Sequence, residues 1–288
     1  MYKRQPQWSL RAEGTYRRSA SLQSPLYILG NTASEVWTTG GSVRWKDGQR
    51  SLRATFHHYD MRAGIFYDMA NESPAGFQAR LDRNAPVTAD LWTVTYDIER
   101  PLQAVTHDRA TLHASTGVGE TASLDVTYAY QQNDRQEYES TRGDIETPQY
   151  DFLLRTHSVD SVFRHGEAWW GAAVMSGEAG VQGSFQENVY NGYSLIPNHR
   201  ALGGGLFVVE RLSWHEFEFE AGARHDRLHR SVWFTEDDFG RHERRGTLDP
   251  AGCDTSGVRI GCSNDYGATS LSLGGLWRVV PDLSLIHI

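Results

Sequence analysis

Polar and apolar residues alternate along much of the chain, most regularly near residue 220. From 216 to 224 the even-numbered positions are charged except for one glycine, and the odd-numbered positions are Phe217, Phe219, Ala221 and Ala223. Successive side chains of a strand point to opposite faces, so this stretch predicts a strand with one charged and one apolar face. Soluble β-sandwiches and membrane β-barrels both contain such strands.

The joining of the strands distinguishes these two classes. Extended segments are predicted at 8–18, 37–46, 51–61, 108–116, 121–132, 152–163, 168–180, 200–212, 216–230 and 265–280. Gly-containing or otherwise short turns are predicted at 46–49, 117–120, 164–167 and 213–215. Long polar connections are predicted at 19–36, 61–107, 133–151, 181–199 and 231–264.

This alternation of short and long connections is typical of outer-membrane barrels, which have short periplasmic turns and long extracellular loops. Long structureless loops are uncommon in compact soluble domains. We therefore predict an all-β fold, an antiparallel transmembrane β-barrel that is present in part, with about ten strands of a larger barrel. The strands should be about 9 to 14 residues long, with all short turns at one end.

Tryptophans support the membrane assignment because they gather near the predicted short turns. They are Trp45, Trp169, Trp170 and Trp214, with Trp277 close to the end of the last strand. Aromatic side chains with one apolar and one hydrated side collect at membrane interfaces. The alternative is that these residues cover the ends of a soluble core.

Composition excludes two other classes. The net charge of -8 comes without a stripe of basic residues, which argues against a nucleic-acid partner. Mean hydropathy is -0.54, and no apolar run approaches the roughly 18 residues of a spanning helix. A barrel strand needs only about 10 residues, half of them polar, so a barrel is compatible with these values.

Landmarks along the chain carry a family resemblance. The segments 56–60, 64–65, 130–138, 195–198, 206–207 and 220–226 are similar, in order and spacing, to landmarks of the TonB-dependent outer-membrane receptors. The resemblance implies a barrel of about 22 strands around a plug. It also implies a place in the bacterial outer membrane, contact with its lipid and with the TonB complex, and import of a scarce ligand such as a siderophore, metal complex or cobalamin.

Within such a barrel the two faces of the strands have different surroundings. We expect the lumen face to carry Glu216, Glu218, Glu220, Arg224, Asp125 and Thr127. The lipid face should carry Leu124, Val126, Tyr128, Tyr130, Phe217 and Phe219. Ligand-binding residues and the plug are not identifiable in the sequence.

The two ends of the chain are interpreted as foreign. Residues 2–5 and 283–288 are what a sequencing-adapter transposase end encodes when read in frame, so we assign 1–5 and 283–288 to adapter read-through. Residues 6–282 are then a partial receptor barrel.

Cys253 and Cys262 are the two cysteines, both in the long connection 231–264. An exported protein meets an oxidising compartment, so we predict a disulfide between them. A zinc site is the alternative, but two thiolates would leave its tetrahedron incomplete.

Histidines give weaker indications. His225 and His229 share one strand face at a separation of about 13 Å, too far to share one metal, and His57 and His58 point to opposite faces. His199 and His242 in the loops could join a ligand site with Asp237, Asp238 or Glu243. We predict no metal, cofactor or catalytic residue, because no nucleophile elbow, phosphate loop or His-Glu-x-x-His helix is present.

Two alternatives to a receptor stay open. One is a passive porin-like or adhesin barrel, which the missing upstream sequence would distinguish. The other is a soluble carbohydrate-binding β-sandwich, which should be soluble without detergent.

Overall fold

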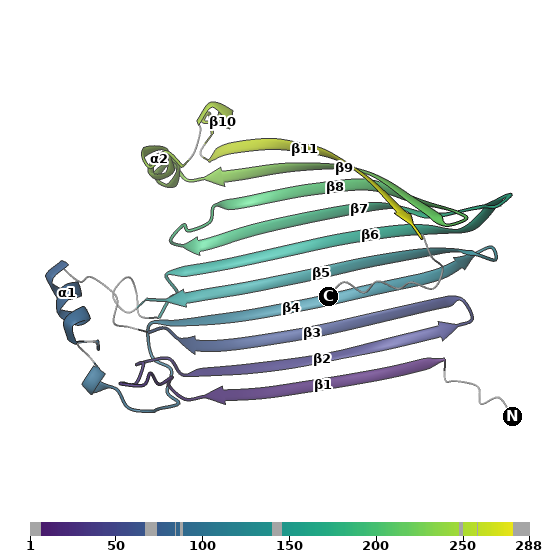
Figure 1. The fold of residues 1–288 in the computed structure, drawn as a ribbon. Coiled ribbons are helices and arrows are strands. Elements are labelled where there is room, and N and C mark those ends of the chain that lie inside the picture. The colour runs from purple at the N-terminus through teal and green to yellow at the C-terminus, as the bar shows by residue number, and fades with distance from the viewer. Residues whose placement is uncertain are drawn as a thin grey trace, which may run out of the picture.

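The computed structural model describes residues 7–66, 74–83, 85–86, 89–139, 146–247, 250–257 and 259–278. These residues form one 11-stranded antiparallel sheet in the order β1-β2-β3-β4-β5-β6-β7-β8-β9-β11-β10 (Figure 1). The strands are β1 (Trp8–Ser19), β2 (Ser34–Asp47), β3 (Arg50–Gly64), β4 (Leu102–Val118), β5 (Ala122–Tyr138), β6 (Tyr150–Trp170), β7 (Ala173–Gly192), β8 (Asn198–Trp214), β9 (Phe217–Phe234), β10 (Cys253–Asp254) and β11 (Ile260–Trp277). The predicted all-β, antiparallel class is confirmed.

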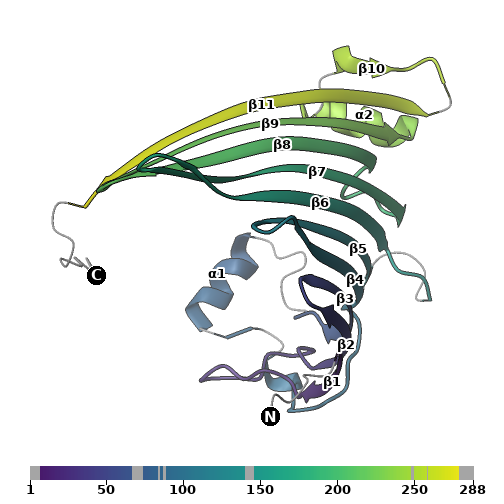
Figure 2. The same ribbon diagram turned by 90° about the vertical axis from the view of Figure 1, so that its right-hand side faces the viewer.

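The sheet curves strongly and does not close on itself (Figure 2). Neighbouring strands are also neighbours in sequence from β1 to β9, as in an up-and-down barrel wall. The predicted β-sandwich alternative is wrong for the described residues, because a sandwich needs two sheets packed face to face and the strands here form one sheet.

Short turns join alternate strands at one end of the sheet (Figure 1). Their backbones use the left-handed region, which suits tight hairpins. The residues and φ values are Gly48 at 56°, Gly119 at 66°, Gly171 at 63° and His215 at 50°. The turns predicted near 47, 118 and 214 are therefore confirmed.

The turn predicted at 164–167 is wrong. β6 continues through it to Trp170, and the register with β7 shifts between His165 and Ala168. A β-bulge accommodates one extra residue of β6 there, so a glycine that resembles a turn signal marks an irregularity within a strand. The true turn follows Trp170, at Gly171.

The strands are longer than predicted. Apart from β10 they contain 12 to 21 residues. They continue where both faces are polar, as in β5 beyond Gln131, so the alternation of polarity ends before the strand does. The predicted connection 181–199 is mostly strand, and only 193–197 separate β7 from β8.

The long connections carry the helices, at the end opposite the short turns. These are α1 (Pro74–Arg83), the 3-10 helix η1 (Ala89–Leu91), α2 (Glu236–Arg244) and the 3-10 helix η2 (Pro250–Gly252). Figure 2 shows α1 on the concave side. None of the described helices has the length and apolar character to cross a membrane.

The connection between β1 and β2 is joined to the connection between β3 and β4 through Asn31, which is 3% exposed. Its Nδ2 donates to the carbonyls of Ile65 (3.1 Å) and Pro101 (2.7 Å), and its Oδ1 accepts from the Glu99 N–H (2.9 Å). Residues 20–33 are thus attached to both ends of the connection between β3 and β4. The Ser21 N–H also donates a hydrogen bond to the Thr95 carbonyl oxygen (2.8 Å).

The connection after β9 has a small core of its own, made of Phe234, Phe239, Ile260 and Cys262. Thr235 begins α2 by accepting a hydrogen bond from the Asp238 N–H, as N-cap residues do. Cys253 and Cys262 are opposite each other on β10 and β11, joined by a disulfide with a Cα–Cα distance of 4.1 Å. The segments assigned to adapter, 1–5 and 283–288, lie outside the described residues.

Candidate functional site

The concave face of the sheet is polar near the short turns. Asp125 and Thr127 of β5 and Glu218 and Glu220 of β9 share this face with Arg224, as predicted from the alternation. Glu216 differs because β9 begins at Phe217, so Glu216 belongs to the turn.

Arginines on neighbouring strands pair with these carboxylates. Arg164 lies 2.6 Å from Asp125 and 3.0 Å from Glu178, and Arg211 lies 3.1 Å from Glu218 and 2.7 Å from Glu220. Cross-strand pairs of opposite charge favour this register. Sequence analysis did not identify Arg164 or Arg211 as partners, because pairing across strands depends on a register that one strand's pattern does not contain.

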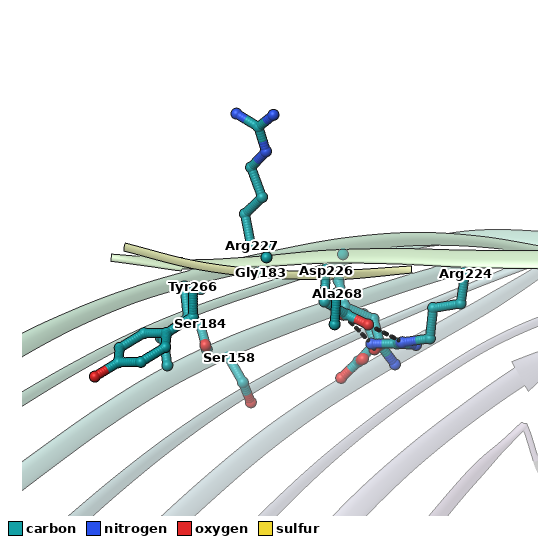
Figure 3. A pocket seen from close by; sticks show the side chains of 15 residues that line it. Ser158, Gly183, Ser184, Arg224, Asp226, Arg227, Tyr266 and Ala268 are labelled. Carbon is teal, nitrogen blue, oxygen red and sulfur yellow. Dashed lines mark hydrogen bonds and ion pairs between the residues drawn. The ribbon is translucent and has the colours of Figure 1, made fainter. Parts of the chain in front are cut away.

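A hollow of about 390 Å³ lies on the same concave face, farther from the short turns, and extends from β6 to β11 (Figure 3). Arg224 lines one end of it and donates from Nε and Nη2 to the two carboxylate oxygens of Asp226, each at 2.6 Å. Nη2 also donates to Gln182 Oε1 at 2.6 Å. The other polar side chains around the hollow are Ser158, Asp160, Ser184 and Tyr266.

Glycines create the space for this arrangement. A Cβ at Gly205 would lie 2.3 Å from Asp226 Oδ1, and one at Gly203 would lie 2.7 Å from Ser184 Oγ. Contacts this short do not occur, so a methyl group at either position would push the Asp226 or Ser184 side chain out of its present place. The result is a half-exposed surface with fixed donors and acceptors, suited to holding a polar group rather than to covalent chemistry.

The convex face is mainly apolar at the same distance from the short turns. Val126, Tyr128, Phe217 and Phe219 share it, together with Leu124 and Tyr130, as predicted. Polar pairs interrupt it in places, among them His165 Nε2 with Glu210 Oε2 at 3.0 Å and His58 Nδ1 with Asp108 Oδ1 at 2.7 Å. Such a face is stable against lipid, whereas a wholly hydrated one would expose a large apolar area.

Tryptophans form a row on the convex face beside the short turns. The register places Trp8 opposite Trp45 and Trp214 opposite Phe217, which stacks on Trp277 at 5.8 Å between ring centroids. Trp170 belongs to the same row, but Trp169 points to the other face. Sequence analysis missed Trp8, whose place follows from its pairing with Trp45.

Aromatic residues recur farther up the convex face. The rings of Tyr16 and Trp37 are in tilted contact with 4.2 Å between centroids, and the rings of Tyr128 and Tyr130 lie 6.1 and 4.8 Å from that of His157. Two aromatic rows that border an apolar band are the arrangement of a membrane barrel.

The loop residues proposed as a ligand site are not brought together. His199 contacts Gln186 and the Pro197 carbonyl, and His242 contacts Thr247. Asp238 instead accepts a hydrogen bond from Tyr190 and pairs with Arg241 at 2.9 Å.

The remaining histidines have separate partners. His57 and His58 lie on opposite faces, near Glu13 and Asp108 respectively. His225 and His229 share the convex face and contact Thr269 and Asp265. Across the described part of the chain, no group of three or more His, Cys, Asp or Glu side chains could hold a metal ion.

Comparisons with known proteins come from structure. No protein-family model and no curated protein matches the sequence. The open form of the ferric-catecholate import receptor Fiu from E. coli K12 matches with a TM-score of 0.65 at 13% identity, over 97% of this chain and 49% of that one.

Two receptors from Acinetobacter baumannii match with a TM-score of 0.59 each. The siderophore receptor PiuA is 8% identical over 95% of this chain and 44% of its own, and the ferric preacinetobactin receptor BauA is 11% identical over 95% and 41%. The chain thus spans less than half the length of these receptors. Its fold is that of part of a TonB-dependent outer-membrane receptor barrel.

Proposed function

We propose that the chain is part of an outer-membrane receptor that captures a scarce ligand, such as a siderophore or metal complex, and imports it with energy supplied by TonB. The structural neighbours include receptors named for ferric-catecholate import and for a siderophore. Residues 6–282 would form about half of the barrel wall, and other parts of the protein would supply the plug and the contact with TonB.

The observation that carries this proposal is the difference between the two faces of one curved sheet. The convex face is apolar between two aromatic rows, and the concave face holds Arg224, Asp226 and Gln182 in a hydrogen-bonded hollow. A polar lumen inside an apolar surface is what a transport barrel in the outer membrane requires. The small core of the connection after β9 gives that connection a defined shape at the mouth.

The test is uptake by the full-length protein that contains this chain. It would be expressed in a bacterial strain without its own ferric siderophore receptors and supplied with radioactive iron as a panel of catecholate, hydroxamate and citrate complexes. We expect uptake of at least one complex in cells with TonB and none in cells without it. Equal uptake without TonB would instead support a passive barrel, and a soluble protein outside the membrane fraction would contradict both.

A further inference from the structure

The convex face of β9 changes character partway along the strand. Phe217, Phe219, Ala221 and Ala223 are followed on the same face by His225, Arg227 and His229. Figure 3 shows Arg227 on the side of the sheet opposite Arg224 and Asp226. A basic group on the outside of the wall has no part in the proposed lumen.

A hollow of about 830 Å³ surrounds this group on the convex side. The hollow is open beside Arg227 because the two positions paired with it, Gly204 of β8 and Gly267 of β11, have no side chains. Leu202 lines the hollow on the side away from the short turns. Leu206 of β8 and Leu271 of β11 share the convex face nearer the short turns. The hollow therefore combines a basic centre with apolar neighbours.

The charge of Arg227 is not neutralised within the described residues. No carboxylate there is within ion-pair distance of it, and its Nε lies 3.4 Å from His225 Nε2. His229 Nδ1 lies 2.8 Å from Asp265, and His225 Nδ1 lies 2.8 Å from Thr269. The guanidinium is therefore free to take an anionic group from outside.

The height of Arg227 identifies the source of that anion. Arg227 comes ten residues after Phe217, which belongs to the aromatic row at the short turns. At about 3.3 Å per residue and a tilt of about 40°, the rise along the membrane normal is about 25 Å. This equals the height of the apolar band of an outer-membrane barrel, so Arg227 lies level with the headgroups of the outer leaflet.

We propose that Arg227, flanked by His225 and His229, binds a phosphate group of an outer-leaflet lipid, whose acyl chains lie along the apolar residues nearer the turns. A planar guanidinium can hold two phosphate oxygens at once, which fixes the lipid in orientation as well as in place. The proposal rests on the outer-membrane location in the proposed function, but not on which ligand the lumen transports.

The experiment is native mass spectrometry of the full-length barrel protein in a neutral detergent, titrated with dioleoyl phosphatidic acid as a lipid with a terminal phosphate. Arg227→Gln removes the charge on the convex face. Arg230→Gln is the matched control, because Arg230 lies three residues along the same strand on the concave face. We expect Arg227→Gln to weaken lipid binding about fivefold to tenfold, and Arg230→Gln to leave it unchanged.

Inorganic phosphate is titrated in a parallel arm. Equal losses for the two variants, no retained lipid on the unchanged protein, or competition by inorganic phosphate at the concentration of the lipid would each overturn the proposal. Because binding is measured without transport, failure here leaves iron uptake unaffected. Conversely, absent uptake with Arg227-dependent lipid binding would fault only the proposed function.

Discussion

At the scale of single residues, the place of the Asp226 carboxylate in the concave-face hollow depends on the absence of a Cβ atom at Gly205. Gly205 is paired with Asp226 across β8 and β9, and the carboxylate lies over the Gly205 Cα. Arg224 holds that carboxylate with two hydrogen bonds, and the same guanidinium binds Gln182 on the far side of β8. The position of Arg224 on the concave face therefore depends on the backbone of the intervening strand.

Replacing Gly205 with alanine should displace this group. The new Cβ would lie 2.3 Å from Asp226 Oδ1 and 3.0 Å from Arg224 Nη2, so the carboxylate must move and its paired hydrogen bonds with Arg224 are weakened. We expect a small decrease in the free energy of unfolding of the full-length protein, because solvent screens a pair that is this exposed. Denaturant titration in detergent measures this.

Gly204→Ala is the control, because its Cβ would face the convex side with 3.7 Å to the nearest atom, the Gln182 carbonyl oxygen. That variant should be neutral or slightly more stable, because alanine has fewer unfolded conformations than glycine. Equal effects of the two substitutions would show that Gly205 has no special role.

At the scale of elements, the sequence pattern predicts strands better than it predicts their ends. β9 is predictable because its two faces differ at every position from Phe217 to Arg224. The end of β6 is not, because Gly166 lies in a bulge, and a glycine in a bulge has the same local sequence as one in a turn. The part of β7 from Val181 onward is not predictable as strand, because Gly183 and Glu187 interrupt the face that carries Val181, Phe185 and Val189.

The connection between β9 and β11 should depend on its disulfide. Replacing both Cys253 and Cys262 with serine removes a closure of about ten residues, an effect of roughly 2 to 3 kcal/mol on that segment. Phe239 would then be held to Phe234 by packing alone. We expect faster hydrogen exchange in 236–259 and unchanged exchange in 217–230.

Thiol titration of the exported full-length protein checks the bond itself. We expect no reactive thiol before reduction and two after it. Two reactive thiols without reductant would rule the disulfide out, and faster exchange throughout β9 in the double variant would show that the bond supports the wall as well as the loop.

At the scale of the whole molecule, the sequence predicts the fold class, the two faces of the sheet and its two ends, but it does not predict the site. Alternation of polarity identifies the two faces, and the turns identify the two ends. The hollow around Arg224 requires side chains from β6, β7, β8, β9 and β11 at one height, and that height depends on register. A strand that slipped by one residue would reverse its faces, so the sequence of one strand cannot locate its partners.

The isolated chain should not fold to a stable monomer. β1 presents one unpaired edge and most of β11 presents another, and exposed edges bind other strands. The wall also has few fully buried side chains of its own. Expressed alone, residues 7–278 should be recovered as aggregates, whereas the full-length protein should migrate faster on a gel before boiling than after it. A monodisperse, detergent-free peak for residues 7–278 in gel filtration would contradict this.

Asn31 has a consequence for limited proteolysis. Because its side chain is bonded to residues on both sides of the connection 65–101, and Ser21 is bonded to Thr95, each half of 20–33 has its own attachment to that connection. A cut between exposed Leu26 and Tyr27 would leave two fragments that stay together under native conditions. They would separate only when denaturant removed those hydrogen bonds and the pairing of β1 with β2. The nicked protein would thus keep the folded arrangement of these two connections at the end of the sheet opposite the short turns.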